Sequence, residues 1–202
     1  MKKLSLVSLA LAGILASGAA NAQFFGTVGF TNVNPQSDNG ALAGADASVN
    51  DAWSLTGSVG YKFTPNIFAQ LGTALVAFDH DVSLDGLGTV ASLSQRPTVL
   101  SLNYQFMAEG SVRPFIGIGY GWVTISDEET EGALSGLGIS ASDSNGFTYG
   151  GGVDFFVNDN FFIRADVSVL DFSTDVRVET LGDVGTAEVD PVVFGLSLGY
   201  QF

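Results

Sequence analysis

Few side chains in this sequence could do acid–base chemistry, and the single histidine, His80, is the first to consider. Asp79 and Asp81 flank it, and a histidine beside a carboxylate can act as a general base. In an extended chain, however, adjacent residues point to opposite faces, and no serine or further aspartate can be placed beside the imidazole from the sequence. We therefore predict that the chain is not an enzyme and has no catalytic residue.

Acidic residues form a second group, Asp127-Glu128-Glu129 with Glu131 close behind. Oxygen ligands of this kind suit Ca²⁺ or Mg²⁺, and such a run could hold a divalent cation that also contacts lipopolysaccharide. The spacing is not that of an EF-hand loop, so a solvated surface is the preferred interpretation. No metal site and no cofactor are predicted, and the lack of cysteine excludes disulfides and thiol chemistry.

The elements that position the remaining polar residues are predicted from a period of two in the hydropathy. Across Val192–Phe202 the even positions are apolar or aromatic and the odd positions are mostly small or polar, which is typical of a strand with one apolar face. The same split recurs along the chain at lengths that suit a tilted membrane-spanning strand. It predicts eight strands, at 24–34, 52–63, 67–78, 96–107, 113–125, 146–157, 161–173 and 189–202.

The connections between these strands alternate strictly between short and long. Outer-membrane barrels alternate periplasmic turns with extracellular loops in this way. The short turns are 64–66, 108–112 and 158–160, and the long segments are 35–51, 79–95, 126–145 and 174–188. Aromatic residues gather near the strand ends, where interfacial girdles belong. The predicted fold is all-β, an eight-stranded antiparallel transmembrane β-barrel.

The N-terminus carries an export signal. Met1-Lys2-Lys3 is a basic head, an apolar run follows as far as Leu15, and Ala20-Asn21-Ala22 is an A-x-A cleavage site. The run is shorter than the roughly 20 apolar residues that span a bilayer. We predict a cleaved Sec signal peptide over residues 1–22 and a barrel domain over residues 23–202, located in the outer membrane of a Gram-negative cell.

Composition supports the same class of protein. The chain is 46% hydrophobic, yet no apolar run after the signal approaches the length of a membrane-spanning helix, and only helices and closed barrels satisfy every backbone group in lipid. Loss of Lys2 and Lys3 with the signal lowers the formal charge from −14 to −16. This acidity argues against nucleic-acid binding, which needs basic residues for the phosphates.

The inward positions of the predicted strands fall into two sets by depth. Charged residues gather toward the periplasmic end, where Lys62 and Arg164 can neutralise Asp154 and Asp166, because charges inside a narrow barrel need partners. We predict that this set is a structural plug, since eight strands enclose a lumen that side chains can fill; an ion-selective pore is the alternative. Toward the extracellular end the predicted inward residues are apolar: Val33, Val76, Phe78, Val123, Leu170, Phe172 and Val193.

This apolar set has two interpretations, core packing or a pocket for a lipophilic molecule with few polar groups nearby. The inward glycines Gly117, Gly119, Gly121, Gly150 and Gly152 would leave room for a pocket, which is the preferred interpretation. They could equally relieve crowding in a tightly curved barrel.

Pro191 indicates how a molecule could leave such a pocket above a plugged floor. A proline cannot donate to the sheet ladder, so strand pairing is weakened near the extracellular rim. We predict a lateral exit into the membrane beside Pro191. The alternative is an ordinary proline at the first residue of a strand.

Several motifs, taken in order, resemble the OmpW family of outer-membrane proteins. They are Arg96-Pro97-Thr98-Val99-Leu100, the RPFIGIG segment at 113–119, the VDPVVF segment at 189–194, Phe78-Asp79-His80 and Leu170-Asp171. The resemblance covers essentially the whole mature chain, which departs from the family in its acidic loops and at Val192. It implies an eight-stranded barrel with a narrow apolar interior that passes small hydrophobic molecules, with His80 at the rim of the pocket.

Two functions fit these observations. The preferred one is uptake of small hydrophobic molecules through a narrow apolar channel or pocket, with lateral release into the membrane. The alternative is a structural or adhesive barrel whose loops contact other cells or phage. The expected partners are outer-membrane lipid and lipopolysaccharide, small hydrophobic molecules, and the barrel assembly machinery, whose recognition signal the terminal Phe202 resembles.

Overall fold

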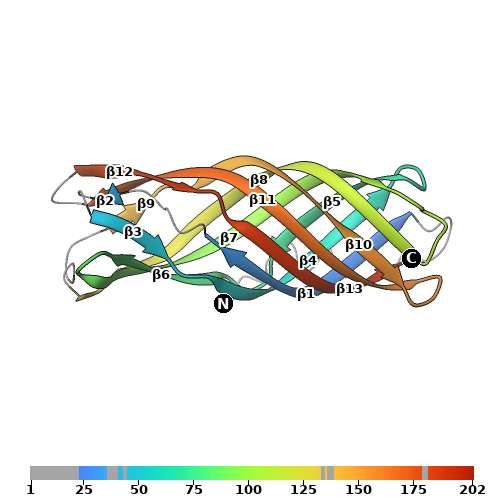
Figure 1. Ribbon diagram of the computed structural model, residues 1–202, viewed down its shortest axis with the longest axis horizontal. Helices are drawn as coiled ribbons and strands as arrows, with labels where there is room; N and C mark the ends of the chain where they lie inside the picture. Colours follow the sequence, from blue (N-terminus) through green and yellow to red (C-terminus); the bar gives the residue numbers. More distant parts are fainter. Residues whose placement is uncertain (1–22, 36–40, 43–44, 133–134, 136–138, 179–181) are drawn as a thin grey trace, which may run out of the picture.

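The computed structural model describes residues 23–35, 41–42, 45–132, 135, 139–178 and 182–202. The predicted signal peptide, residues 1–22, lies outside the described residues. None of the described segments forms a helix of the length and hydropathy that a membrane crossing needs. The regular elements are instead antiparallel strands arranged around one axis (Figure 1).

Eight strands pair side by side in a closed ring. Their order around the ring is β1–β4–β5–β7–β8–β10–β11–β13, and β13 returns to β1. The ring confirms the predicted eight-stranded antiparallel barrel and has no free edge, as a sheet in lipid requires. Its strands are β1 (Phe24–Asn34), β4 (Ala52–Lys62), β5 (Ile67–Ala74), β7 (Gly88–Gln105), β8 (Val112–Thr130), β10 (Ser144–Phe156), β11 (Phe161–Val178) and β13 (Val192–Gln201).

The end of the barrel with the short turns also holds the last residue of the chain (Figure 1). Side chains close two of these turns locally: Thr64 Oγ1 accepts the N–H groups of Asn66 and Ile67, and Asn158 Oδ1 accepts those of Asn160 and Phe161. Such side-chain caps are what Thr and Asn contribute to turns. The three short turns are therefore confirmed, and we take this end as periplasmic.

At the opposite end the sheet continues well past the predicted strands. All four segments predicted as long loops contain paired strands, so the prediction of loops there is wrong in part. Backbone groups that would face water as a loop are paired instead, and the barrel wall becomes taller at this end. The additional strands are β2 (Ala41–Leu42), β3 (Ala45–Val49), β6 (Phe78–Leu84), β9 (Ile139–Ala141) and β12 (Gly182–Val189).

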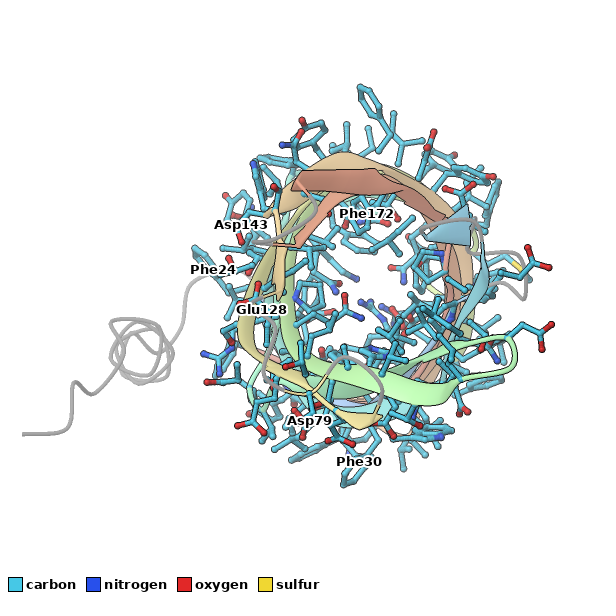
Figure 2. The ribbon with its side chains drawn as sticks, turned by 90° about the vertical axis from the view of Figure 1, so that its left-hand side faces the viewer. Phe24, Phe30, Asp79, Glu128, Asp143 and Phe172 are labelled. Carbon is cyan, nitrogen blue, oxygen red and sulfur yellow. The ribbon has the colours of Figure 1, made fainter. Side chains whose placement is uncertain are left out.

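Side chains alternate between the two faces of the wall as the period of two predicts. On β13, Phe194, Leu196 and Leu198 are 49–64% exposed, whereas Gly199 between the outward positions is buried. Figure 2 looks along the barrel axis, with Phe30 outside the ring and Phe172 inside it. The exposed apolar face is the surface that lipid covers in a membrane barrel.

Aromatic side chains form an outer girdle at the periplasmic end. Neighbouring rings meet edge to face with centroids 4.8–5.2 Å apart, the arrangement that aromatic pairs prefer. The girdle confirms the predicted gathering of aromatics at strand ends. Its members are Phe24, Tyr61, Phe63, Tyr104, Phe106, Phe161, Tyr200 and Phe202.

A bulge interrupts the strand that was predicted to run over 67–78. The N–H groups of Leu75 and Val76 both donate to the carbonyl of Leu55, at 2.9 and 3.3 Å. Two consecutive residues therefore pair with a single residue of β4. The extra residue turns Val76 outward, where it is 56% exposed. The prediction that Val76 faces the interior is therefore wrong, because a bulge shifts the alternation that sequence parity assumes.

Candidate functional site

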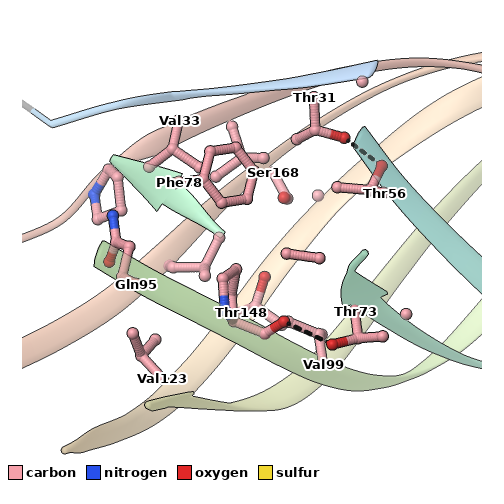
Figure 3. Close-up of a pocket in the computed structure, with 18 of the residues that line it drawn as sticks. Thr31, Val33, Thr56, Thr73, Phe78, Gln95, Val99, Val123, Thr148 and Ser168 are labelled. Atoms are coloured by element: carbon pink, nitrogen blue, oxygen red, sulfur yellow. Dashed lines mark hydrogen bonds between the residues drawn. The ribbon is translucent and has the colours of Figure 1, made fainter. Parts of the chain in front are cut away.

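A cavity of about 310 Å³ occupies the barrel lumen. Its lining reaches Pro35 and Val82 toward the extracellular end and Arg164 and Asp166 toward the periplasmic end. Lys62 and Asp154 do not line it and belong to the layer beneath. This volume lies at the lower end of the range of small-molecule pockets. Figure 3 shows part of its wall, with Phe78 and Val33 near one end and the bonded Thr31–Thr56 pair further in.

The floor is held by a salt bridge between neighbouring strands. Arg164 on β11 stands opposite Asp154 on β10, and its Nε and Nη2 donate to the two carboxylate oxygens at 2.6 and 2.8 Å. Gln70 accepts from Nη1. Gln105 donates to Asp154 at 2.8 Å and accepts from Lys62 at 3.0 Å. Both charges of the pair are buried and hydrogen-bonded, which is the condition for an ion pair to persist out of water.

Four phenylalanines surround the same guanidinium. The Cζ of Arg164 lies 4.7–5.4 Å from the ring centroids of Phe25, Phe68, Phe115 and Phe162, within the range of cation–π contacts. These rings are buried and form one apolar cluster, which we call the aromatic sleeve. Sequence reasoning missed most of the sleeve, although adjacent apolar pairs at 24–25, 67–68 and 161–162 were a signal. In a strand, one member of such a pair faces lipid and the other must face the lumen.

The predicted charge pairing holds for only one of the two couples. Arg164 pairs with Asp154 as predicted. Lys62, however, donates to Gln105 and lies over the ring of Phe156, and among the described residues it makes no ion pair with a carboxylate. Within the described part of the chain, Asp166 has no hydrogen bond or ion pair. The prediction that Lys62 and Arg164 together neutralise both aspartates is therefore wrong in detail.

Small hydroxyl side chains line the middle of the cavity. Thr27 bonds to Ser58 at 2.6 Å and Thr31 to Thr56 at 2.7 Å, both between β1 and β4. These short side chains satisfy one another in pairs and leave the centre of the lumen open. The interior thus has three layers, where the sequence predicted two.

The inward glycines of β8 and β10 do not create this space. A Cβ at Gly119 would lie 2.6 Å from the carbonyl of Leu100, and one at Gly152 would lie 2.5 Å from that of Ala165. At Gly119, Gly150 and Gly152 neighbouring backbone occupies the room that a side chain needs, and at Gly117 and Gly121 the side chains of Asn103 and Phe172 occupy it. This supports the alternative that these glycines relieve crowding in a tightly curved wall.

The extracellular part of the cavity is apolar. Six of the seven residues predicted for it line the cavity, and only Val76 does not. They pack in two groups on opposite sides, one around Phe78 with Val33 and one around Leu170 with Val123 and Phe172. Val193 contacts both groups. We call these six residues the apolar chamber.

His80 stands at the top of the chamber and is buried, with 1% of its surface exposed. Its Nδ1–H donates to the carbonyl of Asn50 at 2.8 Å, and Nε2 accepts from Gln95. Burial lowers the pKa of His80 below its usual 6.5, while the Asn50 carbonyl and nearby aspartates act in the opposite direction. Asp79 and Asp81 are exposed on the other face, as the alternation predicts. Neither ring nitrogen contacts a hydroxyl or a carboxylate in the described structure, so the arrangement resembles no nucleophile–base pair.

The barrel wall has two interruptions beside the cavity. Pro191 is buried between β12 and β13, and its carbonyl accepts the N–H of Leu170 at 3.2 Å. The second interruption was not predicted. The ladder between β5 and β7 ends at the Thr73–Thr98 pair and resumes only at Phe78 on β6. The four residues 74–77 lie opposite only two residues of β7, Arg96 and Pro97.

The acidic run Asp127-Glu128-Glu129 lies at the end of β8, beyond the membrane-facing part of the wall. Asp127 accepts a hydrogen bond from the Ser126 hydroxyl at 3.3 Å. Across the described residues, no group of three or more His, Cys, Asp or Glu side chains is arranged to hold a metal ion. Asp127 and Glu129 are exposed, whereas Glu128 is half-buried and lines the cavity.

The chain is similar to known proteins both in sequence and in fold. The sequence model of the OmpW family matches residues 20–202. Outer membrane protein W of Salmonella typhimurium is 33% identical over 217 residues, covering 100% of each chain. Dibenzothiophene metabolism operon protein PahQ of Pseudomonas aeruginosa is 30% identical over 169 residues, covering 78% of this chain and 74% of that protein. The crystal structure of the outer membrane protein OprG from Pseudomonas aeruginosa has a TM-score of 0.78 at 27% identity, covering 92% of this chain and 98% of OprG.

Proposed function

The chain belongs to the OmpW family and is an outer-membrane β-barrel, and on that premise we propose that its apolar chamber takes up small hydrophobic molecules from outside the cell. The observation that supports this proposal is the cavity. It is apolar toward the extracellular end, and the aromatic sleeve bounds it toward the periplasmic end. A relative encoded with dibenzothiophene metabolism supports this class of ligand, since dibenzothiophene is an apolar aromatic compound.

The Arg164–Asp154 pair and the aromatic sleeve fill the lumen on the periplasmic side of the cavity. This favours lateral release over passage into the periplasm. The break beside Pro97 is the wider of the two interruptions, because four residues face two. Each break is partly bridged by one hydrogen bond of 3.2 Å, from the Leu170 N–H to the Pro191 carbonyl and from the Thr73 hydroxyl to the Pro97 carbonyl. We therefore propose exit through the wall near Pro97, with the predicted exit at Pro191 as the second route.

Uptake of N-phenyl-1-naphthylamine, a neutral dye that fluoresces in lipid, tests the chamber. Intact cells expressing the protein are compared with cells expressing Phe78→Asp or Leu170→Asp, which place a charge on the apolar path. Val76→Asp is the matched control, because the structure turns that neighbouring side chain outward. We expect the two chamber variants to slow dye entry at least severalfold and the control to retain it. Equal rates in all four strains would argue against the chamber as the route.

The exit is tested with Pro97→Val and Pro191→Val in the same assay. Either valine restores a backbone donor that can strengthen strand pairing. Slower uptake in one variant alone assigns the exit to that break. If neither variant changes the rate, lateral release at both places is wrong.

The other expected partners are lipid, lipopolysaccharide and the barrel assembly machinery, and each is also a proposal. The exposed apolar face contacts outer-membrane lipid. We further propose that Phe202 is recognised by the barrel assembly machinery and that lipopolysaccharide surrounds the extracellular wall. A barrel that serves only adhesion through its loops is the competing function, and a filled lumen would have favoured it over the cavity found here.

A further inference from the structure

Asp166 occupies an unusual position on the floor of the cavity. It points inward from β11, and its partners in register on the two neighbouring strands are glycines, Gly152 and Gly195. A Cβ at Gly195 would lie 2.8 Å from both carboxylate oxygens. The carboxylate therefore lies against bare backbone at the cavity surface.

In the part of the chain that the structure describes, the basic residue on the same face of β11, Arg164, makes no hydrogen bond to this carboxylate. Arg164 stands two residues away on the same face of β11, but it directs two donors to Asp154 and a third to Gln70. In the described structure Asp166 has no hydrogen bond or ion pair. Asp166 is half-buried, and a carboxylate in a confined cavity is stabilised by a donor or a cation beside it. A ligand in the cavity can supply one.

The walls above Asp166 change from polar to apolar with height. Ser168 follows above Asp166 on the same face of β11, and Ser197 on β13 lies one step below it, opposite Arg164; both are on the cavity surface. Higher still come Leu170 and Phe172 of the apolar chamber. The cavity is thus matched to a molecule with an apolar body and one polar end that points to the floor.

The charge at the cavity mouth has the same sign as Asp166. Of the basic residues outside the signal peptide, Lys62, Arg113 and Arg164 lie near the periplasmic end, which leaves Arg96 and Arg177 for the other end. Acidic residues crowd that end, and a mouth of one sign concentrates ligands of opposite charge. Those exposed in the described structure include Asp46, Asp51, Asp79, Asp81, Asp85, Asp127, Glu129, Glu131, Asp143 and Asp190.

From these observations we propose that Asp166 is a cation subsite and that the cavity favours small amphiphiles carrying an ammonium group at one end of an apolar body. The proposal rests on the proposed function and names the ligand class of the same cavity. The ammonium group donates to the Asp166 carboxylate and the adjacent serine hydroxyls, and the apolar body fills the chamber above. Anionic amphiphiles of equal length are disfavoured at both the mouth and the floor.

Three probes of equal chain length separate charge from hydrophobicity: hexylammonium, hexanol and hexanoate. Each is titrated into the ¹⁵N-labelled mature barrel in lipid nanodiscs, and binding is followed by the amide shifts of Ser168 and Gly195. Asp166→Asn removes the charge with little change of shape. Gly195→Ala is a second variant, in which the new Cβ displaces the carboxylate. Asp159→Asn, in an exposed periplasmic turn, is the matched control.

We expect hexylammonium to bind wild type and Asp159→Asn at least about tenfold more tightly than Asp166→Asn or Gly195→Ala. Hexanol affinity should be similar in all four proteins, and hexanoate should bind most weakly. If hexanol binds but hexylammonium shows no dependence on Asp166, the cation subsite is wrong and the hydrophobic pocket stands. If neither hexanol nor hexylammonium binds wild type, the proposed pocket fails together with the subsite.

Discussion

Arg164 and Asp154 face each other across β11 and β10, joined by two hydrogen bonds of 2.6 and 2.8 Å. The same guanidinium reaches Gln70 on β5, and the carboxylate accepts from Gln105 on β7. The pair therefore ties strands from opposite parts of the ring across the lumen. This cross-link, wrapped in the aromatic sleeve, closes the periplasmic side of the cavity.

Removing one member of this pair is expected to destabilise the barrel strongly. Arg164→Met leaves Asp154 buried and uncompensated, which should lower the free energy of unfolding by about 3–5 kcal/mol. Urea titration of the barrel in lipid vesicles, followed by tryptophan fluorescence, measures the loss. The double change Arg164→Met with Asp154→Leu should recover much of it. A single variant as stable as wild type would contradict the role given to the pair.

The aromatic sleeve is expected to prevent ion leakage. Phe68 is buried, with 1% of its surface exposed, whereas Phe30 faces lipid at 61%. Phe68→Ala opens the floor beside Arg164, and we expect ion-conducting steps in planar bilayers that wild type does not show. Phe30→Ala is the control and should show no ion-conducting steps. Identical traces for both variants would place the barrier elsewhere.

Gly60 is expected to be intolerant of a side chain. Phe25 lies against its backbone in register on the next strand, and a Cβ there would overlap the ring. Gly60→Ala should lower the free energy of unfolding by about 1–3 kcal/mol, the usual cost of overpacking. Gly26→Ala is the comparison, since its Cβ would meet nothing closer than 3.6 Å. Equal stability of the two variants would show that the ring can move away freely.

The extracellular wall around His80 is expected to weaken in mild acid. Burial lowers the pKa of His80 from its usual 6.5, so the folded state favours the neutral ring and the unfolded chain binds the proton first. Its contribution is complete above about pH 6.5 and is lost as the pH falls through the lower pKa of the folded state. Hydrogen exchange of β6 amides, compared between wild type and His80→Gln, measures this. Protection that falls equally in both proteins would assign the effect to the surrounding aspartates.

Much of the architecture could be predicted from the sequence because a membrane barrel obeys strict local rules. The period of two in segments such as Val192–Phe202 places each side chain toward lipid or lumen. Short turns such as 64–66 and 158–160 carry their own capping residues. The placement of Val123 and Leu170 inside the chamber follows from parity alone.

The sequence by itself therefore determined the strand number, the two faces of the wall and the separation of apolar from charged interior residues. The tertiary structure decided the features that the alternation of side chains along a strand does not predict. A bulge at 75–77 reverses Val76, and closure of the ring brings Gln70 within reach of Arg164 across 94 positions of sequence. Saturation of that guanidinium by Asp154 and Gln70 leaves Asp166 alone on the cavity floor. Such pairings depend on which strands face each other across the lumen, and this is set by the curvature and register of the closed sheet rather than by any local pattern.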